Sequence, residues 1–571
     1  MNKPHSKLLA FNKIFYELNK KYGYKVASDW LSKEWNGFFY LHDSHSSTWT
    51  PYCFAYDIEN LVKKGLYFIK GFNAQPPQHL TTYTDFVGEF VSWASNRSSG
   101  ACGLPSFLVY SYYFWKKDVE NGYFIKSPEY YRDQEFQRII YKLNQPYLRV
   151  NQSAFTNFSI FDRDYLVEIF GGKEFPDGSF MIDSIEEIIE YQKDFMRVVS
   201  EIRSKNMMTF PVLTMSLLRH EDGTWGDEDF AKWCCQHNMK WADSNFFISS
   251  SVTSLSNCCR LLSDVAELGY FNSIGGTALE VGSIKVNTLN LARISYENSK
   301  EDYLNALEEL VILDLKCLDV IRDIIRRNIE KGLLPNYALD IMHMDSQYNT
   351  IGVIGIYEVL NKYGLVEVDE LGNHSYTDEA LKFSKAIFDK IIEVKEKFRK
   401  EYNCDYKINI EQIPAERAAV VLMEKDKIFH PDEKYELPAY GNQWIPLAVK
   451  CTLQEKIRIS ALLDKYCNGG SIMHCNLSAP FTSFDQAWEM LNYVADQGVK
   501  YFAFCLRISA CENNHGFFGD VCPYCGKPKI TSYQRIVGFL VPTLTYSKER
   551  KQEFMMRTWF DVLSDEHNAV L

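Results

Sequence analysis

The chain alternates long helical patterns with short β-rich runs, and this alternation constrains its fold more than any other feature. The helical patterns lie at 1–35, 183–205, 301–331 and 378–400. The strand-like runs are TFPVLTMSLL (209–218), KVNTLNLARI (285–294), WIPLAV (444–449) and KYFAFCLRI (500–508). Strands that alternate with long helices are typical of α/β proteins. We therefore expect an α/β body over 1–500 and a compact C-terminal unit over 501–571.

Composition excludes several classes of protein. The 571 residues are 46% hydrophobic, which allows a large core, and the net charge of −12 argues against binding of long nucleic acids. No apolar run approaches the roughly 18 residues of a membrane span. The 15 cysteines are odd in number, and MNKPHSKLLAFNKIF lacks the pattern of a signal peptide. Reduced thiols and a cytoplasmic location are therefore expected.

The sequence Cys522-Pro-Tyr-Cys525-Gly is typical of half of a zinc ribbon. Two thiolates three positions apart, followed by glycine, allow backbone amides to turn around both sulfurs. Cys511 and His515 supply the second half, so the predicted site is Cys511, His515, Cys522 and Cys525. Cys505 is a rival ligand, although its place in an apolar run favours a buried hydrophobic role. Four protein ligands leave no open position, which indicates a structural metal.

Gly538 lies in the run Arg535-Ile-Val-Gly-Phe-Leu-Val, shortly after this motif. Glycine is a poor strand residue, and a bulge or a close backbone approach would explain it. A second use is chemical. A radical on Cα is stabilised by the flanking amide and carbonyl groups only if Cα is flat, and glycine alone flattens without driving a side chain into the neighbouring peptide planes. Gly538 is therefore a candidate for storing an unpaired electron.

RIVGFL after a cysteine motif resembles the C-terminus of anaerobic (class III) ribonucleotide reductases, which are glycyl radical enzymes. Further stretches resemble this family in the order expected: FFYLHD (38–43), PYCFAYDIENLVKKGL (51–66), NQPYLRVNQSAFTN (144–157), SNCCRLL (256–262), GSIKVNTLNLARI (282–294), NTIGVIGIYEVL (349–360), NIEQIPAERAAV (409–420) and NQWIPL (442–447). The resemblance implies a ten-stranded α/β barrel with a central finger loop. It also implies anaerobic reduction of ribonucleoside triphosphates to 2′-deoxyribonucleoside triphosphates.

The resemblance implies how a radical would reach the substrate. In Asn257-Cys258-Cys259-Arg260, the cysteine directly before arginine matches the loop cysteine of the family, so Cys259 is expected to form the thiyl radical. Gly538 would generate this thiyl, which would abstract the ribose 3′-hydrogen, and the 2′-OH would leave as water. Asn257 is a candidate for binding the ribose hydroxyls.

In the family that this chain resembles, the reducing electrons come either from formate or from a pair of cysteines that a redoxin recharges. Three residues bear on which source this chain uses. Cys53 matches a second active-site cysteine of the family. Glu280 stands where formate-using members carry asparagine. A carboxylate there can act as general base on the 3′-OH and would repel formate, which is also an anion. Both residues favour the thioredoxin- or glutaredoxin-dependent branch. The second reducing thiol stays open, and Cys258 is one candidate.

Further expectations concern binding and partners. Gln152, Ser153 and the segment 409–416 are expected to form walls of the nucleotide site. FFYLHD begins at residue 38, which leaves no room for an N-terminal ATP cone. Overall on/off regulation by ATP and dATP through such a module is therefore not expected. Control of specificity by deoxynucleotide or ATP effectors at a homodimer interface is expected by analogy alone. The family also implies an activating enzyme that uses S-adenosylmethionine and an iron–sulfur cluster.

Two alternatives remain open at this point. A glycyl radical enzyme of the pyruvate formate-lyase type would use adjacent cysteines such as Cys258 and Cys259. A non-catalytic zinc-ribbon binding protein would explain the metal motif but would leave Gly538 and Cys259 without a role.

Overall fold

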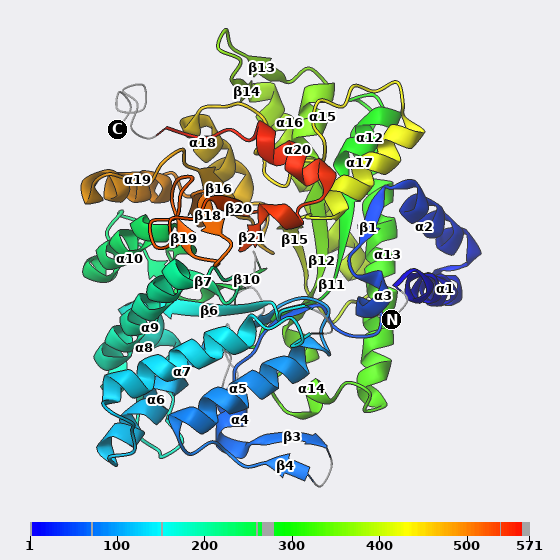
Figure 1. Ribbon diagram of the computed structural model, residues 1–571. Coiled ribbons are helices and arrows are strands. Elements are labelled where there is room, and N and C mark those ends of the chain that lie inside the picture. The colour runs from blue at the N-terminus through cyan, green and yellow to red at the C-terminus, as the bar shows by residue number, and fades with distance from the viewer. Residues whose placement is uncertain are drawn as a thin grey trace.

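The computed structural model describes residues 3–69, 72–149, 152–257, 261–264, 279–536 and 538–561. Figure 1 shows a mixed α/β molecule in which helices surround a central sheet. Strands such as β7 (Val212–Leu218) are buried along their whole length. In a closed barrel one face of each strand packs against the outer helices and the other faces the filled interior, so both faces are buried. Among the described residues, no helix combines the length and the hydropathy of a membrane span.

The central sheet contains two sets of five parallel strands. The first set is β2 (Cys53–Ala55), β5 (Cys102–Gly103), β6 (Thr156–Phe161), β7 and β8 (Ser244–Ser249). The second set is β11 (Gly282–Asn290), β12 (Gln347–Ile354), β15 (Ile408–Gln412), β16 (Met473–Asn476) and β17 (Tyr501–Cys505). The two sets meet in antiparallel pairs, β11 with β2 and β17 with β8. β1 (Phe39–Leu41) pairs with β11 outside this order.

The ring is closed between β15 and the residues just before β16. Glu411 and Gly470 form a parallel bridge, and the Gln412 amide donates to the Gly470 carbonyl at 3.0 Å. This closure completes a barrel of ten strands along the path from β15 to β16, with β11 and β8 on opposite sides. The ten-stranded α/β barrel predicted from the sequence is confirmed.

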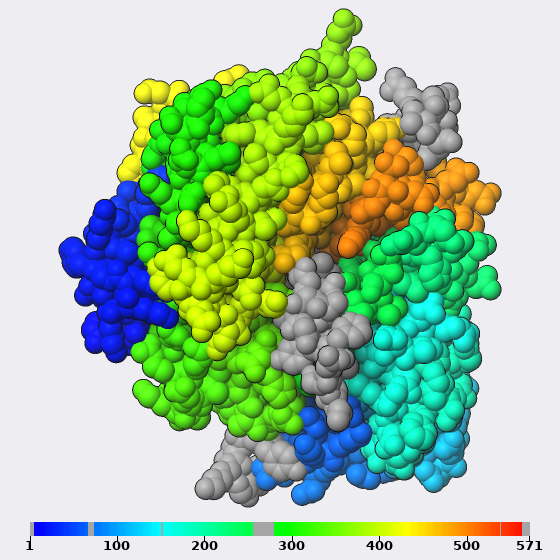
Figure 2. Space-filling view, turned by 180° about the vertical axis from the view of Figure 1, so that it is seen from behind, coloured from blue at the N-terminus to red at the C-terminus, as the bar shows by residue number. Residues whose placement is uncertain are grey.

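Helices cover the outside of the barrel. The longer ones are α1 (Lys3–Tyr22), α2 (Tyr24–Asn36), α5 (Leu80–Ser95), α6 (Phe107–Glu120), α7 (Pro128–Leu143), α8 (Arg163–Phe170), α9 (Ile185–Lys205), α10 (Glu228–Trp241), α13 (Tyr303–Glu330), α16 (Asp378–Glu401), α17 (Ala418–Phe429), α18 (Leu453–Asp464) and α19 (Phe484–Asp496). Shorter ones are α3 (Ser44–Ser47), α4 (Glu59–Lys64), α12 (Leu291–Glu297), α14 (Pro335–Ala338) and α15 (Ile356–Lys362). Seen from behind, α1 and α2 in dark blue form one edge of the molecule, across from α5 to α9 in lighter blue and cyan (Figure 2).

Most predicted elements are confirmed and one strand is wrong. The strand predicted at 285–294 ends with β11 at Asn290, because α12 begins at Leu291. The four helical patterns become α1 and α2, α9, α13 and α16, and the run 209–218 contains β7. The strand predicted at 444–449 is irregular backbone. Pro446 interrupts this run, and side chains replace strand partners: Tyr376 donates to the Trp444 carbonyl, and Lys456 donates to the Ile445 carbonyl at 3.0 Å.

Two hairpins outside the barrel sheet are β3 (Leu66–Ile69) with β4 (Phe72–Ala74) and β13 (Val366–Val368) with β14 (His374–Tyr376). A third hairpin pairs β9 (Ser254–Asn257) with β10 (Leu261–Asp264), and β9 contacts the barrel strands β7 and β8. This third hairpin corresponds in sequence to the predicted finger loop.

The C-terminal unit is a small antiparallel sheet followed by a helix. Its strands are β18 (Ile508–Cys511), β19 (Gly516–Phe517), β20 (Lys529–Arg535) and β21 (Leu540–Pro542), in the order β19-β18-β20-β21, and α20 (Lys548–Met556) follows them. The sequence predicts a single strand over 500–508, but this run supplies the barrel strand β17 and then the start of β18. The small sheet therefore begins at Ile508, inside the range 501–571 predicted for a separate unit. The division into two domains stays a proposal.

Candidate active site and metal centre

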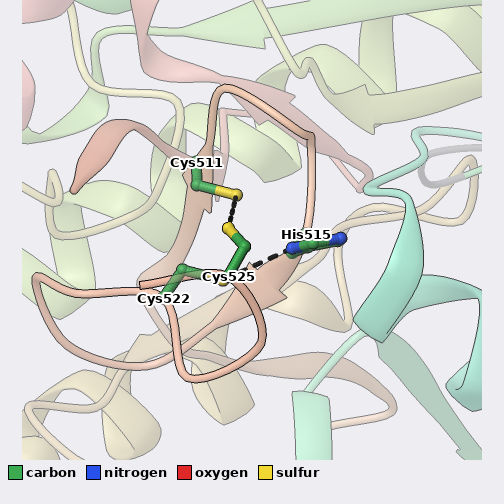
Figure 3. Close-up of side chains that lie close together, drawn as sticks. All are labelled: Cys511, His515, Cys522 and Cys525. Atoms are coloured by element: carbon green, nitrogen blue, oxygen red, sulfur yellow. Dashed lines mark hydrogen bonds between the residues drawn. The ribbon is translucent and has the colours of Figure 1, made fainter. Parts of the chain in front are cut away.

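The four predicted metal ligands lie together at one end of the small sheet (Figure 3). Their ligand atoms all lie within 4.8 Å of one another, with Cys511 Sγ 3.7 Å from Cys525 Sγ and Cys522 Sγ 3.4 Å from His515 Nδ1. A tetrahedral site with Zn–S bonds of about 2.3 Å separates neighbouring sulfurs by about 3.8 Å. The donor set and its spacing therefore fit zinc.

Local turns bring these ligands together. Cys511 ends β18, and Asn514, with φ of 61°, reverses the chain before His515. The second turn runs through Gly526, whose φ is 69° and whose amide donates to the Cys522 carbonyl at 2.9 Å. The rival ligand Cys505 lies in β17 and is not part of the group. Cys505 Sγ lies instead 3.5 Å from the Ala503 carbonyl, as expected for a buried thiol.

Gly538 lies in the connection of a hairpin whose strands belong to the same sheet. β20 and β21 pair in antiparallel register, with Arg535 opposite Leu540, and the connection between them is 536–539. Gly538 is buried, and Asn245 Nδ2, from the barrel strand β8, donates to its carbonyl oxygen at 3.1 Å. The neighbouring Phe539 packs against Phe155 and Phe210, with ring centroids 5.4 and 5.3 Å away. The hairpin therefore extends from the small sheet to the barrel wall.

A cavity of about 320 Å³ lies beside this hairpin. Its described lining is Tyr40, His42, Asp43, His45, Ser46, Tyr52, Cys53, Ser99, Gly100, Ala101, Arg149, Gln152, Phe155, Ser283, Val286, Glu411, Ile413, Pro414, Ala415, Glu416, Arg417, Ala418 and Phe539. The lining combines a thiol, carboxylates, arginines and histidines in one space. Cys53 and the residue after Gly538 thus share a cavity large enough for part of a nucleotide.

Cys53 is half-buried on β2 and faces this cavity. The Ala101 amide lies 3.3 Å from Cys53 Sγ, and β2 pairs with β11 so that Cys53 is opposite Ser283. The predicted second active-site cysteine is therefore on a barrel strand that is paired on both sides. Cys258 and Cys259 lie outside the described residues, between β9 and β10, and Asn257 is the last residue of β9.

Glu280 lies just before β11 and is not among the described residues that line the cavity. Its carboxylate is 3.6 Å from His343 Nε2, and its side chain is 23% exposed. Burial, followed by the nearby Asp57 carboxylate, raises the pKa of Glu280 to about 7, although Lys173 opposes the shift. The structure thus places Glu280 in a charged cluster about the Lys173 ammonium, which pairs with Asp57 and Glu59 at 2.6 and 2.9 Å.

Charged residues of the cavity include some to which the sequence assigned no individual role. Glu411 is buried on β15 and lines the cavity, as do Arg149 and Arg417. The run INIEQ offered a signal for Glu411, because polar residues alternate with isoleucine along a strand that is otherwise apolar. Of the walls predicted from sequence, Gln152 and part of 409–416 line the cavity. Ser153 instead donates to the Asn144 carbonyl at 3.0 Å.

Comparison with known proteins agrees with this geometry. The family model for anaerobic ribonucleoside-triphosphate reductase matches residues 1–560. A search of curated proteins finds no match.

Several solved structures are similar over nearly the whole chain. A protein described as an anaerobic ribonucleotide reductase is 42% identical, with a TM-score of 0.91 over 98% of this chain and 88% of that one. The Thermotoga maritima anaerobic ribonucleotide reductase in complex with dATP and CTP is 42% identical, with a TM-score of 0.89 over 97% of this chain and 90% of that one. The same enzyme with dATP in its specificity site is 41% identical, with a TM-score of 0.87 over 95% of this chain and 90% of that one. These matches do not favour an enzyme of the pyruvate formate-lyase type or an inert zinc-ribbon protein. The chain belongs to the anaerobic ribonucleoside-triphosphate reductase family and is an oxidoreductase that reduces ribonucleotides anaerobically.

Proposed function

We propose that Gly538 stores the unpaired electron of this enzyme and that Cys259 becomes the thiyl that attacks the substrate. The observation that carries the proposal is the position of Gly538. It is buried in a hairpin connection at the barrel wall, and Phe539 lines the cavity that also contains Cys53. The stem of the predicted finger loop supports the route, because β9 contacts β8, the strand that holds the Gly538 carbonyl through Asn245.

The proposed reaction balances in atoms and electrons. Cys259, having given its thiol hydrogen to the Gly538 radical, takes the 3′-hydrogen of the ribose. A carboxylate accepts the 3′-OH proton, and the 2′-OH leaves as water with a proton from one thiol of the reducing pair, so that a ketone is left at C3′ and a radical at C2′. The pair, Cys53 and a second cysteine, then gives one hydrogen atom to C2′ and one electron to the ketone and is left as a disulfide. The carboxylic acid returns its proton to the 3′ oxygen. Cys259 then returns its hydrogen to C3′ and recovers the thiyl.

Two carboxylates are candidates for the base. Glu280 is the one expected from the sequence, and a pKa of about 7 suits proton transfer at neutral pH. Glu411 is supported by its position, since it lines the cavity with Cys53. Either carboxylate would repel formate near the ribose. We therefore propose recycling by a thioredoxin- or glutaredoxin-like protein, with Cys258 as one candidate for the second thiol.

Ribonucleoside triphosphates are the proposed substrates, and deoxynucleotides or ATP the proposed effectors. The Thermotoga maritima relative was solved with dATP and CTP, which supports both proposals. Arg149 and Arg417 give the cavity the cationic groups that a phosphate requires. A homodimer in the cytoplasm is proposed by analogy with the family.

The zinc site is proposed to be structural. Four protein ligands complete a tetrahedral shell, so the metal would hold β18 and the loop 511–525 together rather than bind water for catalysis. When bound, zinc would supply a coordination centre with no open position, and it would take no part in the reaction. A stiff C-terminal unit would let the β20–β21 hairpin leave the barrel as one piece for a radical S-adenosylmethionine activase.

The test is anaerobic activation followed by EPR and product analysis. The wild-type protein, treated with the activase, S-adenosylmethionine and a reductant, should give a doublet from the α-hydrogen of Gly538 and should convert CTP to dCTP. Gly538→Ala should give neither. Turnover with a thioredoxin-like protein but not with formate would support the proposed reductant. A doublet that persists in Gly538→Ala, or release of acetyl-CoA instead of a deoxynucleotide, would contradict the proposal.

A further inference from the structure

Three side chains from distant parts of the chain donate to the carbonyls of residues 535, 536 and 538, at the end of the β20–β21 hairpin that we call the glycine hairpin. Arg557 Nη1 donates to the Arg535 carbonyl at 2.8 Å, and Asn442 Nδ2 donates to the Ile536 carbonyl at 2.8 Å. Asn245 Nδ2 donates to the Gly538 carbonyl at 3.1 Å. Within the described residues, Asn245 is thus the side chain bonded to the glycine itself, and the other two hold the end of β20 and the first residue of the connection.

The Asn245 amide is itself fixed by the barrel. Asn245 is fully buried on β8, and its Nδ2 also donates to the Tyr501 hydroxyl on β17 at 3.0 Å. The Tyr501 oxygen lies 3.4 Å from Thr214 Oγ1 on β7, which accepts from Asn157 Nδ2 on β6 at 3.0 Å. The chain of hydrogen bonds crosses four adjacent strands of the barrel, so the donor to Gly538 has little freedom to move.

A hydrogen-bond donor at the Gly538 carbonyl oxygen acts on the carbonyl group that is conjugated with Cα of the same residue. An unpaired electron on Cα of Gly538 is shared with its carbonyl, and sharing requires the two to lie in one plane. A fixed N–H group aimed at the oxygen favours that plane and stabilises the negative charge that sharing places on the oxygen. It also fixes the direction in which the Cα–H bond points, which governs hydrogen transfer to a cysteine.

We propose that Asn245 is a positioning residue that orients docked Gly538 for hydrogen exchange with the catalytic cysteine. The inference rests on the proposed storage of the radical at Gly538. The same hydrogen bond opposes departure of the hairpin, because it must break before an activase can reach the glycine. Loss of the bond should therefore impair turnover without impairing radical installation.

The expected effect is moderate. A buried hydrogen bond between neutral partners contributes enough to change a rate by about three- to tenfold. Asn245→Ala should form the glycyl radical at least as fast as the wild-type protein, and its turnover per radical should fall about tenfold. The g-anisotropy of the EPR doublet should also change, because spin density on the carbonyl oxygen depends on the donor. A general loss of structure would not change the doublet in this way.

Two further variants make the test specific. Asn245→Leu keeps the approximate size of the side chain but has no hydrogen-bond donor, so it should resemble Asn245→Ala. Asn290→Ala is the matched control: Asn290 is fully buried on β11, across the barrel from β8, and its amide also makes two hydrogen bonds, to the Gly37 carbonyl and to Asp426. It should leave turnover per radical and the doublet unchanged.

The outcomes separate the two proposals. Absence of a doublet from the activated wild-type protein would overturn the proposed radical site, and the role of Asn245 with it. The role of Asn245 alone would be overturned if the wild-type protein behaves as expected and both Asn245→Ala and Asn245→Leu match it in turnover per radical and in g-anisotropy. If Asn245→Ala fails to fold, Asn245→Leu, which fills the same space, decides the question by the same measurements.

Discussion

Gly100 lies so close to Cys53 that a Cβ atom added to Gly100 would lie 2.1 Å from Cys53 Sγ. The same Cβ atom would lie 2.9 Å from the Tyr52 carbonyl oxygen. Neither separation is possible for a real side chain, so the absence of a side chain at 100 creates the space that the thiol occupies. The Ala101 amide, at 3.3 Å from the sulfur, holds the thiol from the same loop.

Gly100→Ala should therefore displace the Cys53 thiol. A shift of about 1 Å in a reacting group can lower a rate by as much as 10²-fold, so we expect turnover with a thioredoxin-like reductant to fall at least tenfold. Formation of the glycyl radical should be unaffected, because Cys53 is not on the proposed route from Gly538 to Cys259. EPR spin counting and dCTP formation, measured on the same samples, test this expectation.

Gly172→Ala is the control for this substitution, because no atom lies within 4 Å of the added Cβ there. It should match the wild-type protein in both measurements. Full turnover of Gly100→Ala with the redoxin would contradict the role of Cys53 as reductant.

The pH dependence of turnover should identify the general base. Burial and the neighbouring Asp57 raise the pKa of Glu280 to about 7, so Glu280 is protonated below that pH and can accept a proton only above it. If Glu280 is the base, kcat/KM rises as pH increases through about 7. Glu280→Gln should then lower kcat/KM by about 10²–10⁴-fold and abolish the rise.

Glu411→Gln is the comparison that decides between the two carboxylates. Retention of activity and pH profile in Glu280→Gln, with loss of both in Glu411→Gln, would assign the base to the cavity wall.

The effect of Glu280 on stability has the opposite direction to its effect on activity. The pKa of Glu280 is higher in the folded protein than in the unfolded chain. Its contribution to the free energy of unfolding is therefore fully present below about pH 4.5 and is lost as pH rises through about 7.

Metal content should distinguish the predicted ligand set from its rival. Cys525→Ser removes one of the four clustered ligands and should reduce bound zinc well below one per chain, as atomic absorption would measure. Cys505→Ser should keep its zinc, because Cys505 lies outside the cluster. Loss of zinc in Cys505→Ser alone would contradict the site.

Removal of zinc should also impair radical formation. β20, which leads to Gly538, pairs with β18, and β18 ends at the ligand Cys511. We expect metal-free protein to show faster hydrogen exchange over 508–535 and a weaker glycyl doublet. An undiminished doublet in protein shown to be free of zinc would refute this coupling.

The sequence predicts the local chemistry of this chain better than it predicts the long-range geometry. Cys511, His515, Cys522 and Cys525 were identified because ligand spacing reflects short loops, and β7 and α16 because hydrophobic periodicity reflects local burial. The cavity was not predictable, because it joins β2, β15 and the loop around Arg149, which meet only after the barrel closes. Glu280 illustrates the limit: its place in the sequence suggested a base, but its surroundings are set by Lys173 and Asp57 from other elements.

A buried ion-pair network links the C-terminal helix to the glycine hairpin and to the cavity wall. Glu553 accepts from Arg557 Nε at 2.8 Å and from Arg550 Nη1 at 3.2 Å. Arg557 also donates to the Arg535 carbonyl, and Arg550 donates to the Ala415 carbonyl, both at 2.8 Å. Although burial raises the pKa of Glu553, the two arginines outweigh burial and hold that pKa below its usual range.

Glu553→Gln should therefore leave two buried guanidinium groups without their counter-charge and destabilise the protein by about 3–5 kcal/mol. The stabilisation by Glu553 is present above its unfolded pKa near 4.5 and is lost as pH falls below that value, so the difference between variant and wild type should shrink in acid. Urea unfolding at pH 7 and pH 4 measures both effects. Glu512→Gln, which removes the exposed pair with Lys527, is the control and should leave the midpoint unchanged. Equal midpoints for Glu553→Gln and Glu512→Gln would show that the network does not stabilise the fold. Arg557 would then be linked to the hairpin only by its hydrogen bond to the Arg535 carbonyl.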